Sequence, residues 1–381
     1  MAGEPDSFDH IPVLADEVAA LLAVVPAGTY VDATVGGGGH ARAVLAAGPQ
    51  LRLLGIDQDP AALAAAGRLL ADQRDRVTLV RARFDELARV VADEQASPVT
   101  AVLFDLGVSS HQLDVADRGF SYRHDGPLDM RMDPDVTTTA ADVVNTWSEG
   151  DLADLLRDQA DERYARRIAR AIVAARPLTS TTELAEVVRD AIPAPARRAG
   201  GHPAKRTFQA LRMAVNAELD VLPVAIDAAI DLLAPGGRIA VLAYHSGEDR
   251  LVKRRFRDEV TGGCTCPPRL PCACGARPRL ALVTRGAVTP GDDEVAANRR
   301  AGSARLRAAE KLDTDGVAAC LRHRPTAPPP GPPRPWSPRR ARPGPPGPGC
   351  GWPPWPRTVA PPSACWARCS SSSCSCRSWA W

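Results

Sequence analysis

The residues best suited to bind a nucleotide-like ligand lie between Tyr30 and His40. An apolar run there breaks into four glycines, Gly36 to Gly39, and a helical pattern begins directly after His40. Only a residue without a Cβ lets the backbone turn sharply and approach a ligand closely, so this pattern is typical of a nucleotide-binding βα unit. A second apolar run, 51–56, ends in Asp57, a position from which a carboxylate can accept hydrogen bonds from ribose hydroxyls.

The glycine loop and the acid do not by themselves distinguish a dinucleotide from S-adenosylmethionine. The loop spacing is not G-x-G-x-x-G, and no set of arginines suited to a pyrophosphate follows it. An NAD-dependent oxidoreductase is therefore an alternative, although no other feature supports a hydride-transfer site. Binding of labelled S-adenosylmethionine against NAD would separate the two.

Further polar groups follow two other apolar runs. Asp105 and Gly107 follow the run 99–104, and His245 and Ser246 follow the run 238–244. A carboxylate at position 105 could accept a hydrogen bond from the amino group of a cofactor or from the exocyclic amine of a base. His245 has a structural alternative as a hydrogen-bonded residue at the end of a strand, and the acidic pair after it would favour the N-terminus of a helix.

These residues need a scaffold that brings the ends of separate strands together. Strands are predicted over 29–34, 51–56, 77–81, 99–104 and 238–244, and helices over 41–47, 60–70 and about 220–233. Alternating strands and helices predict an α/β fold with a parallel, doubly wound sheet that binds its ligand at the carboxyl ends of the strands.

The long interruption, 111–216, reads as an inserted helical segment. Helical spacing of apolar residues marks 152–156, 164–175 and 182–191, the last opening with the capping candidates Thr181 and Thr182. Basic residues cluster in the second of these helices, near position 206 and after His245. We predict phosphate contacts from Arg166, Arg170, Arg206, Arg212 and Arg254. The alternative for the helix 164–175 is a solvated face that pairs with Asp161 and Glu162.

Composition limits the classes of protein to consider. The 381 residues carry a formal net charge of +2, but nine arginines and no acid follow Asp315, so the rest is net acidic and any RNA-binding surface must be local. No apolar run is long enough for a membrane span, and the N-terminus is polar, so we expect a cytoplasmic protein. The segment 316–381 is rich in Pro, Arg, Cys and Trp, and we interpret it as a disordered or out-of-frame tail.

Two Cys-x-Cys pairs, Cys264 with Cys266 and Cys272 with Cys274, offer enough thiolates for a tetrahedral zinc site. The spacing is not the usual Cys-x-x-Cys, and four thiols in such a loop can stay free. The sequence assigns no metal ligand here and leaves both readings open.

Seven short motifs occur together in one order, and together they closely resemble the ribosomal RNA small subunit methyltransferase H family. They are His10 to Leu14, Gly36 to His40, Asp105 to Ser110, Arg118 to Ser121, Asp125 to Asp133, Thr207 to Arg212, and His245-Ser246 with Glu248-Asp249-Arg250. The resemblance covers about 10–312. Departures are His111, Gly247 and Ala41, where the family usually has proline, leucine and serine; the first leaves the rigidity of the loop around Gln112 in question.

The resemblance implies a Rossmann-like class I methyltransferase sheet at 1–110 and 217–315, with a helical, RNA-recognising insertion at 111–216. It implies S-adenosylmethionine-dependent N4-methylation of one cytidine in the decoding region of 16S ribosomal RNA. The implied cofactor residues are Gly38, Gly39, His40, Asp57, Phe84, Asp105 and Gln112. Asp105, His245 and Ser246 are the catalytic candidates.

Several alternatives stay open at this point. Phe84 could face adenine or belong to the core. A non-catalytic RNA-binding or assembly module would also explain the basic clusters, and methyl transfer to small subunits would decide between module and enzyme. The sequence does not determine whether the protein is a homodimer or whether its partner is naked RNA or the small ribosomal subunit.

Overall fold

The structure is a computed structural model that describes residues 12–197, 201–267 and 272–313. The predictions for the segment 316–381 and for His10 and Ile11 lie outside these residues. Among the described helices, none combines the length and the apolar character needed to cross a membrane.

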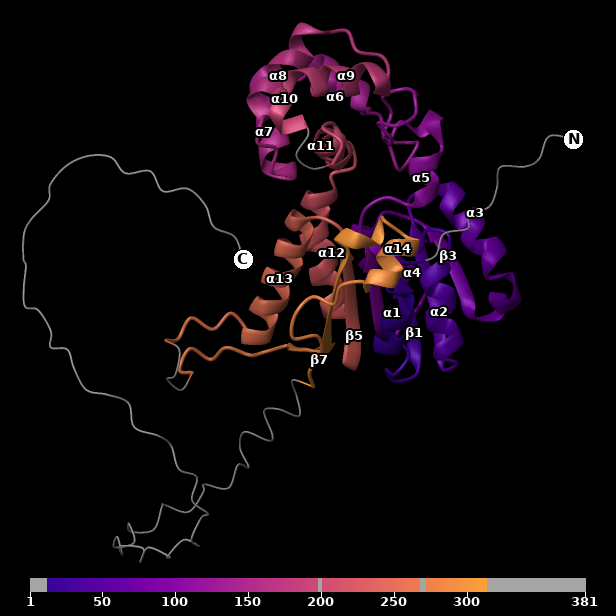
Figure 1. Ribbon diagram of the computed structural model, residues 1–381. Coiled ribbons are helices and arrows are strands. Elements are labelled where there is room, and N and C mark those ends of the chain that lie inside the picture. The colour runs from indigo at the N-terminus through magenta and orange to yellow at the C-terminus, as the bar shows by residue number, and fades with distance from the viewer. Residues whose placement is uncertain (1–11, 198–200, 268–271, 314–381) are drawn as a thin grey trace, which may run out of the picture. The chain divides into compact units, whose positions relative to one another are not determined.

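A seven-stranded sheet with the strand order β3-β2-β1-β4-β5-β7-β6 forms the centre of the fold (Figure 1). The strands are β1 (Gly28–Asp32), β2 (Leu51–Asp57), β3 (Val77–Arg81), β4 (Val99–Asp105), β5 (Leu233–Ala243), β6 (Leu280–Leu282) and β7 (Arg305–Lys311). The first five pair in parallel, whereas β7 runs antiparallel to both β5 and β6. The parallel, doubly wound prediction is confirmed.

The five predicted strands are present, with small differences at their ends. The segment Pro235-Gly236-Gly237, which precedes the predicted strand 238–244, lies inside β5, where the pairing with β4 shifts register between Val99 and Ala101. The strands β6 and β7 were not predicted, because their short or charged sequences show no clear alternation of apolar residues.

Helices cover both faces of the sheet because its central strands are apolar on both sides. In β4, Ala101 and Leu103 pack on one face, and Val102 and Phe104 pack on the other. The first face holds α1 (Ala15–Leu22), α2 (Gly39–Ala47) and α3 (Pro60–Leu69); the second holds α4 (Leu87–Asp93), α12 (Glu218–Leu232) and α13 (Ser246–Thr261). The short α14 (Asp292–Ala297) follows β6.

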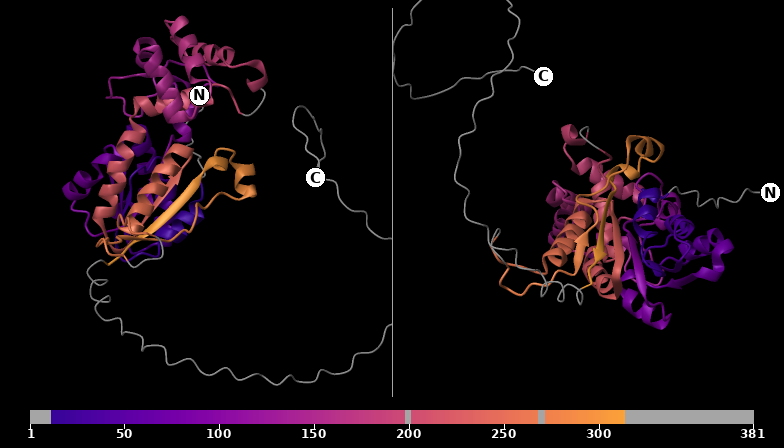
Figure 2. Two further views of the ribbon diagram at one scale, coloured as in Figure 1. Left: turned by 90° about the vertical axis from the view of Figure 1, so that its left-hand side faces the viewer. Right: turned by 90° about the horizontal axis from the view of Figure 1, so that it is seen from below.

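The helical segment between β4 and β5 has a hydrophobic core of its own. After α5 (Ser110–Asp114) come α6 (Ala140–Thr146), α7 (Glu149–Ala160), α8 (Ala165–Ala174), α9 (Thr181–Ala191), α10 (Ala194–Arg197) and α11 (Lys205–Val215). Leu152, Ile168 and Leu184 are fully buried in this core. Figure 1 and the left-hand view of Figure 2 show these helices gathered at one end of the sheet.

The N-cap of α9 differs from the prediction. Ser180 accepts the hydrogen bond from the backbone N–H of Glu183, and the Glu183 carboxylate bonds back to complete a capping box. Thr181 instead donates its hydroxyl to the carbonyl of His124, and Thr182 lies within the first turn. The sequence Ser180-Thr181-Thr182-Glu183 offers three residues that could cap the helix. A capping box needs the cap three residues before the glutamate, and only Ser180 has that position.

The chain returns from the helical segment to the sheet through a tightly bonded junction. Ala217, at φ 52°, separates α11 from α12. On one side the Asn216 side chain donates to the carbonyl of Met130 at 2.9 Å and accepts from the N–H of Met132 at 2.8 Å. On the other side Arg212 and Glu218 form a two-pronged ion pair with both contacts at 2.8 Å. These bonds hold α11 and the segment around Met130 to the start of α12.

Candidate active site

The glycine loop turns sharply at the carboxyl end of β1. Gly36 and Gly38 have φ values of 51° and 86°, in the left-handed region that favours glycine. Gly38 is the N-cap of α2, and Gly39 and His40 begin that helix. The N–H of Gly36 donates to the Asp57 carboxylate at 2.9 Å, which ties the loop to the end of β2. The loop and the acid, which the sequence linked only by inference, are in direct contact.

The Asp57 carboxylate accepts backbone hydrogen bonds on both oxygens. Besides Gly36, the N–H of Asp59 donates to it at 2.9 Å. Burial raises the pKa of Asp57 to about 6, although these N–H donors favour the ionised form. A carboxylate oxygen has two lone-pair sites, so one bond on each leaves acceptor capacity for a hydroxyl.

Asp105 lies at the end of β4 between two side chains from other elements. The Tyr244 hydroxyl donates to one carboxylate oxygen at 2.9 Å, and His40 Nδ1 lies 3.3 Å from the other. The Asp105 N–H donates to the hydroxyl of Thr34 at 2.7 Å, which connects β4 to the loop after β1. The carboxylate is therefore fixed in place at the sheet edge where the glycine loop also lies.

His40 is buried and charged at neutral pH. Its Nε2 donates to the carbonyl of Val13 at 2.8 Å, leaving Nδ1 to face Asp105. Burial alone would lower the pKa of His40, but the hydrogen bond and negative charge of Asp105 outweigh it, and the pKa rises to about 9. His40 and Asp105 thus form an ion pair beside the loop.

Gln112 points toward buried polar partners. Its side chain donates to Asp59 at 3.1 Å and accepts from the N–H of Ser109 at 3.1 Å. Arg118 also donates to Asp59, at 2.8 Å, and to the carbonyls of Arg131 and Met132. This network joins the motif Arg118 to Ser121 and the motif Asp125 to Asp133 to the end of β2.

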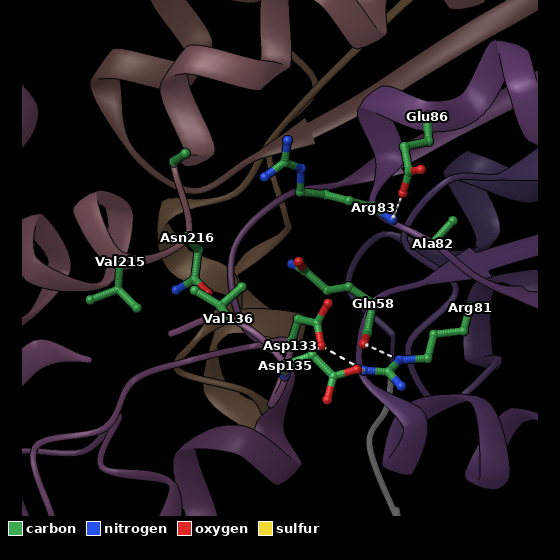
Figure 3. Close-up of a pocket in the computed structure, with 11 residues that line it drawn as sticks. Gln58, Arg81, Ala82, Arg83, Glu86, Asp133, Asp135, Val136, Val215 and Asn216 are labelled. Carbon is green, nitrogen blue, oxygen red and sulfur yellow. Dashed lines mark hydrogen bonds and ion pairs between the residues drawn. The ribbon is translucent and has the colours of Figure 1, made fainter. Parts of the chain in front are cut away.

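A cavity of about 440 Å³ lies beside the ends of β2 and β3 (Figure 3). Its lining includes Gln58, which follows Asp57, and Arg83, which precedes Phe84; the other lining residues are Arg81, Ala82, Glu86, Asp133, Asp135, Val136, Val215, Asn216 and Ala217. Arg81 bonds to Asp133 at 2.6 Å and to Asp135 at 2.7 Å, which Figure 3 shows at one side of the cavity. Residues of the helical segment therefore complete a wall of this cavity.

Phe84 contacts the core beside this cavity. Its ring packs edge-on against Phe104, with ring centroids 6.0 Å apart, and the side chain is half-buried. Phe84 therefore belongs to the core on the side that contacts Phe104.

His245 and Ser246 lie at the end of β5, the strand that pairs with β4. His245 is the N-cap of α13, because its Nδ1 accepts from the N–H groups of Gly247 and Glu248. Its Nε2 lies 2.9 Å from the buried Glu248 carboxylate. Ser246 is exposed and donates its hydroxyl to Asp161 at 2.9 Å. His245 therefore is a hydrogen-bonded residue at the end of a strand, and Glu248 lies in the first turn of the following helix. These are the structural alternatives that the sequence allowed.

The predicted RNA contacts fall into two groups. Arg166, Arg170, Arg206 and Arg254 are exposed, as a phosphate contact requires. Arg212 is not: its pairing with Glu218 is nearly buried, with only 14% of its side chain exposed. The sequence grouped Arg212 with Arg206 because the two are close along the chain, but it could not show that Arg212 turns inward to Glu218. Arg212 is therefore not an RNA contact.

The ion pairs expected for a solvated α8 do not form as predicted. Asp161 accepts from Ser246 and from Arg250 across the junction with α13, and the buried Glu162 accepts from the N–H of Tyr164. Arg170 pairs instead with Glu149 at 3.4 Å.

The sequence did not predict the contacts that several residues of this region make. Tyr244, Asp59, Asn216 and Asp161 act through contacts with distant parts of the chain. Asp59 follows Asp57 by two residues and could have been considered as the N-cap of α3 from its position before Pro60. The other three have no local signal.

The fold is that of a class I, Rossmann-like methyltransferase, in which five parallel strands are followed by the antiparallel β7 and then β6. Residues 7–312 match the model of the MraW methylase family, and the chain belongs to that family. It is a methyltransferase, and its cofactor is S-adenosylmethionine.

Two relatives of known name each match this chain over about 310 residues. Ribosomal RNA small subunit methyltransferase H of Heliobacterium modesticaldum is 54% identical over 311 residues, 80% of this chain and 99% of that protein. The protein of that name from Frankia alni is 55% identical over 310 residues, 79% of this chain and 95% of that protein. A Streptococcus mutans protein solved in complex with SAH is 13% identical with a TM-score of 0.35, over 82% of this chain and 100% of that one. Since that score is low, the fold assignment stands on the strand order.

We predict that the His40 ring titrates near pH 9 and that Asp105→Asn lowers its pKa, because burial persists while the carboxylate charge is lost. Since the folded pKa exceeds the ordinary 6.5, the associated stability is fully present below about pH 6.5 and is lost as the pH rises through about 9. NMR titration of the histidine ring measures both. Tyr244→Phe, which keeps the carboxylate charge, is the control and should leave His40 charged at neutral pH. An unchanged His40 pKa in Asp105→Asn would contradict the pairing.

Proposed function

We propose that this chain transfers a methyl group from S-adenosylmethionine to N4 of one cytidine in the decoding region of 16S ribosomal RNA. The observation that carries the proposal is the Asp105 carboxylate, fixed by His40 and Tyr244 beside the glycine loop. The names of the relatives support ribosomal RNA of the small subunit as the substrate. The N4 position and the decoding region follow from the family resemblance, and we place the reaction in the cytoplasm.

The residues around the loop fit the cofactor. Gly38, Gly39 and His40 would receive it at the start of α2, where backbone N–H groups have no partner within the helix. Asp57 would accept from the ribose hydroxyls. Because the adenine is attached to the ribose, it would occupy the cavity that begins at Gln58, with Phe84 next to it. Gln112 would act through the Asp59 network that shapes this edge.

Asp105 is proposed to orient the attacking amine. The N4 lone pair of cytosine is delocalised into the ring, so the amine is a poor nucleophile. A carboxylate that accepts one of its N–H bonds would orient the amine and stabilise the positive charge that develops on nitrogen during attack. The cofactor supplies the electrophilic methyl group; the C–S electron pair stays on sulfur, and a proton leaves N4.

The end of β5 supplies two secondary candidates for moving the N4 proton. His245 and Ser246 follow the strand that pairs with β4, with Leu242 opposite Asp105. We retain both as groups that could relay this proton. The bonds that His245 makes as an N-cap would have to rearrange for such a relay, so Asp105 is the first candidate.

We propose that the helical segment 111–216 recognises RNA, together with the exposed face of α13. Because the chain up to Asp315 carries a net negative charge, this part can hold a polyanion only through local basic patches. Arg166, Arg170, Arg206 and Arg254 supply such patches on α8, α11 and α13. Asp161, at the end of α7, bonds to both Ser246 and Arg250, which connects the helical segment to the start of α13.

We expect Asp57→Ala to weaken cofactor binding by about 1.5 to 3 kcal/mol, the range for a hydrogen bond to a charged group. This corresponds to roughly a 10- to 150-fold rise in Kd, measurable by calorimetry. Asp72→Ala, an exposed acid outside the site, is the matched control and should bind normally. An unchanged Kd in folded Asp57→Ala would remove the ribose role.

Asp105→Asn should lower methyl transfer by about 100-fold or more at saturating cofactor and RNA. A loss confined to kcat with normal cofactor affinity would identify an amine contact, whereas weakened affinity would identify a cofactor contact.

The function itself is tested in cells whose own copy of the gene has been deleted. These cells receive the native gene, the variant gene or no gene. Mass spectrometry of their 16S RNA should find one N4-methylated cytidine only with the native gene. The same modification level without the gene would reject the proposal.

Arg166→Glu with Arg170→Glu should weaken RNA binding and flatten its dependence on salt, because two phosphate contacts are replaced by repulsion. Cofactor affinity should not change. Filter binding across a salt series measures the slope. The double reversal Arg68→Glu with Arg74→Glu, outside the basic patches, serves as the matched charge reversal. Equal effects of the two reversals would show that α8 is only a solvated face.

A further inference from the structure

Four cysteine thiols meet beyond the end of α13, in the connection to β6. The Sγ atoms of Cys264, Cys272 and Cys274 lie 3.4 to 3.6 Å from one another, and with that of Cys266 all four lie within 4.8 Å. A tetrahedral zinc site with zinc–sulfur distances of about 2.3 Å places its sulfurs about 3.8 Å apart. A disulfide requires about 2.05 Å. The four thiols are thus spaced as ligands around one ion, and all four are free cysteines.

The backbone fixes both arms that carry these thiols. Gly262, at φ 60°, ends α13, and a Cβ there would lie 2.4 Å from the backbone of Arg277, so the outgoing and returning arms are in contact. The Arg279 N–H donates to the carbonyl of Glu259 at 2.9 Å, and its guanidinium bonds to the Glu259 carboxylate at 2.6 and 2.7 Å. The base of the loop is therefore held independently of any metal.

Each Cys-x-Cys pair adjoins a left-handed glycine. Gly263, at φ 71°, precedes Cys264, and Gly275, at φ 73°, follows Cys274. These turns direct the two pairs toward each other. The N–H of Ala273 also points at Cys266 Sγ, 3.4 Å away, a bond that would support a thiolate ligand.

Because the cysteines are exposed or half-buried, apolar packing does not account for their convergence. Among the residues that the structure describes, these four cysteines are the one group of three or more potential metal ligands close enough together to hold a single ion. Sulfur ligands in a tetrahedron suit zinc or iron, and divalent zinc binds such sites more tightly than divalent iron.

We propose that Cys264, Cys266, Cys272 and Cys274 bind one zinc ion in a closed, structural site. Four protein ligands leave no open position for a substrate, which excludes a catalytic zinc. The site is also remote from the chemistry: α13 has 16 residues, about 24 Å of helix, with His245 at its start and the thiols beyond its end (Figure 1). The ion would hold the two arms together where the loop has few apolar contacts.

The test uses the full chain, purified under reducing conditions without chelator, incubated with zinc and desalted. Mass spectrometry should find one zinc per chain. The four loop thiols should react with an alkylating reagent at least tenfold faster after a chelator removes the metal. Reconstitution with cobalt in place of zinc should give the thiolate charge-transfer bands and intense visible bands of a tetrahedral four-sulfur site.

The paired substitution Cys264→Ser with Cys274→Ser should reduce bound zinc to less than a tenth of the native amount. Cys320→Ser with Cys350→Ser removes two cysteines outside the loop and should retain one zinc. A zinc-free native chain after reconstitution, stoichiometric iron in place of zinc, disulfides among the four cysteines, or full zinc content in the first variant would each overturn the proposal. If that variant fails to fold, the cobalt spectrum of the native chain decides.

Discussion

The ion pair between the buried His40 and the half-buried Asp105 is the constraint on which the arrangement of the site depends. A charged imidazole and a carboxylate are costly to bury apart, so each fixes the position of the other. His40 begins α2, Asp105 ends β4, and Tyr244 at the end of β5 donates to the same carboxylate. One interaction therefore aligns the glycine loop with two neighbouring strand ends. The glycine loop and the proposed amine acceptor are therefore held together by direct contacts.

A second set of polar contacts joins the helical segment to the sheet. The Arg212–Glu218 pair and the Asn216 side chain lie where the chain returns to α12, and Arg118 reaches Asp59 near the end of β2. These groups are buried or nearly so, and their bonds offset the cost of removing them from water. As a result the helical segment is positioned to line the cavity beside Gln58.

The two ends of α13 serve different purposes. Its N-terminus carries His245 and Ser246 next to the proposed chemistry, and its exposed face carries basic residues suited to phosphate. Its C-terminus leads into the cysteine loop. The basic residues that we propose to contact RNA on α13 thus lie on a helix whose two ends are each held by contacts to other parts of the chain.

The sequence by itself determined the order and type of the main elements, because apolar periodicity in β1 to β5 and in α7 to α9 is a local property. It also located the glycine loop, Asp57 and Asp105, since glycine and acid directly after a strand have few other uses. Only the tertiary structure decided that Tyr244 donates to Asp105, that Arg212 turns inward to Glu218, and that four thiols converge. Burial and contacts between distant residues set these outcomes, and a helical or strand period does not record which face meets which partner.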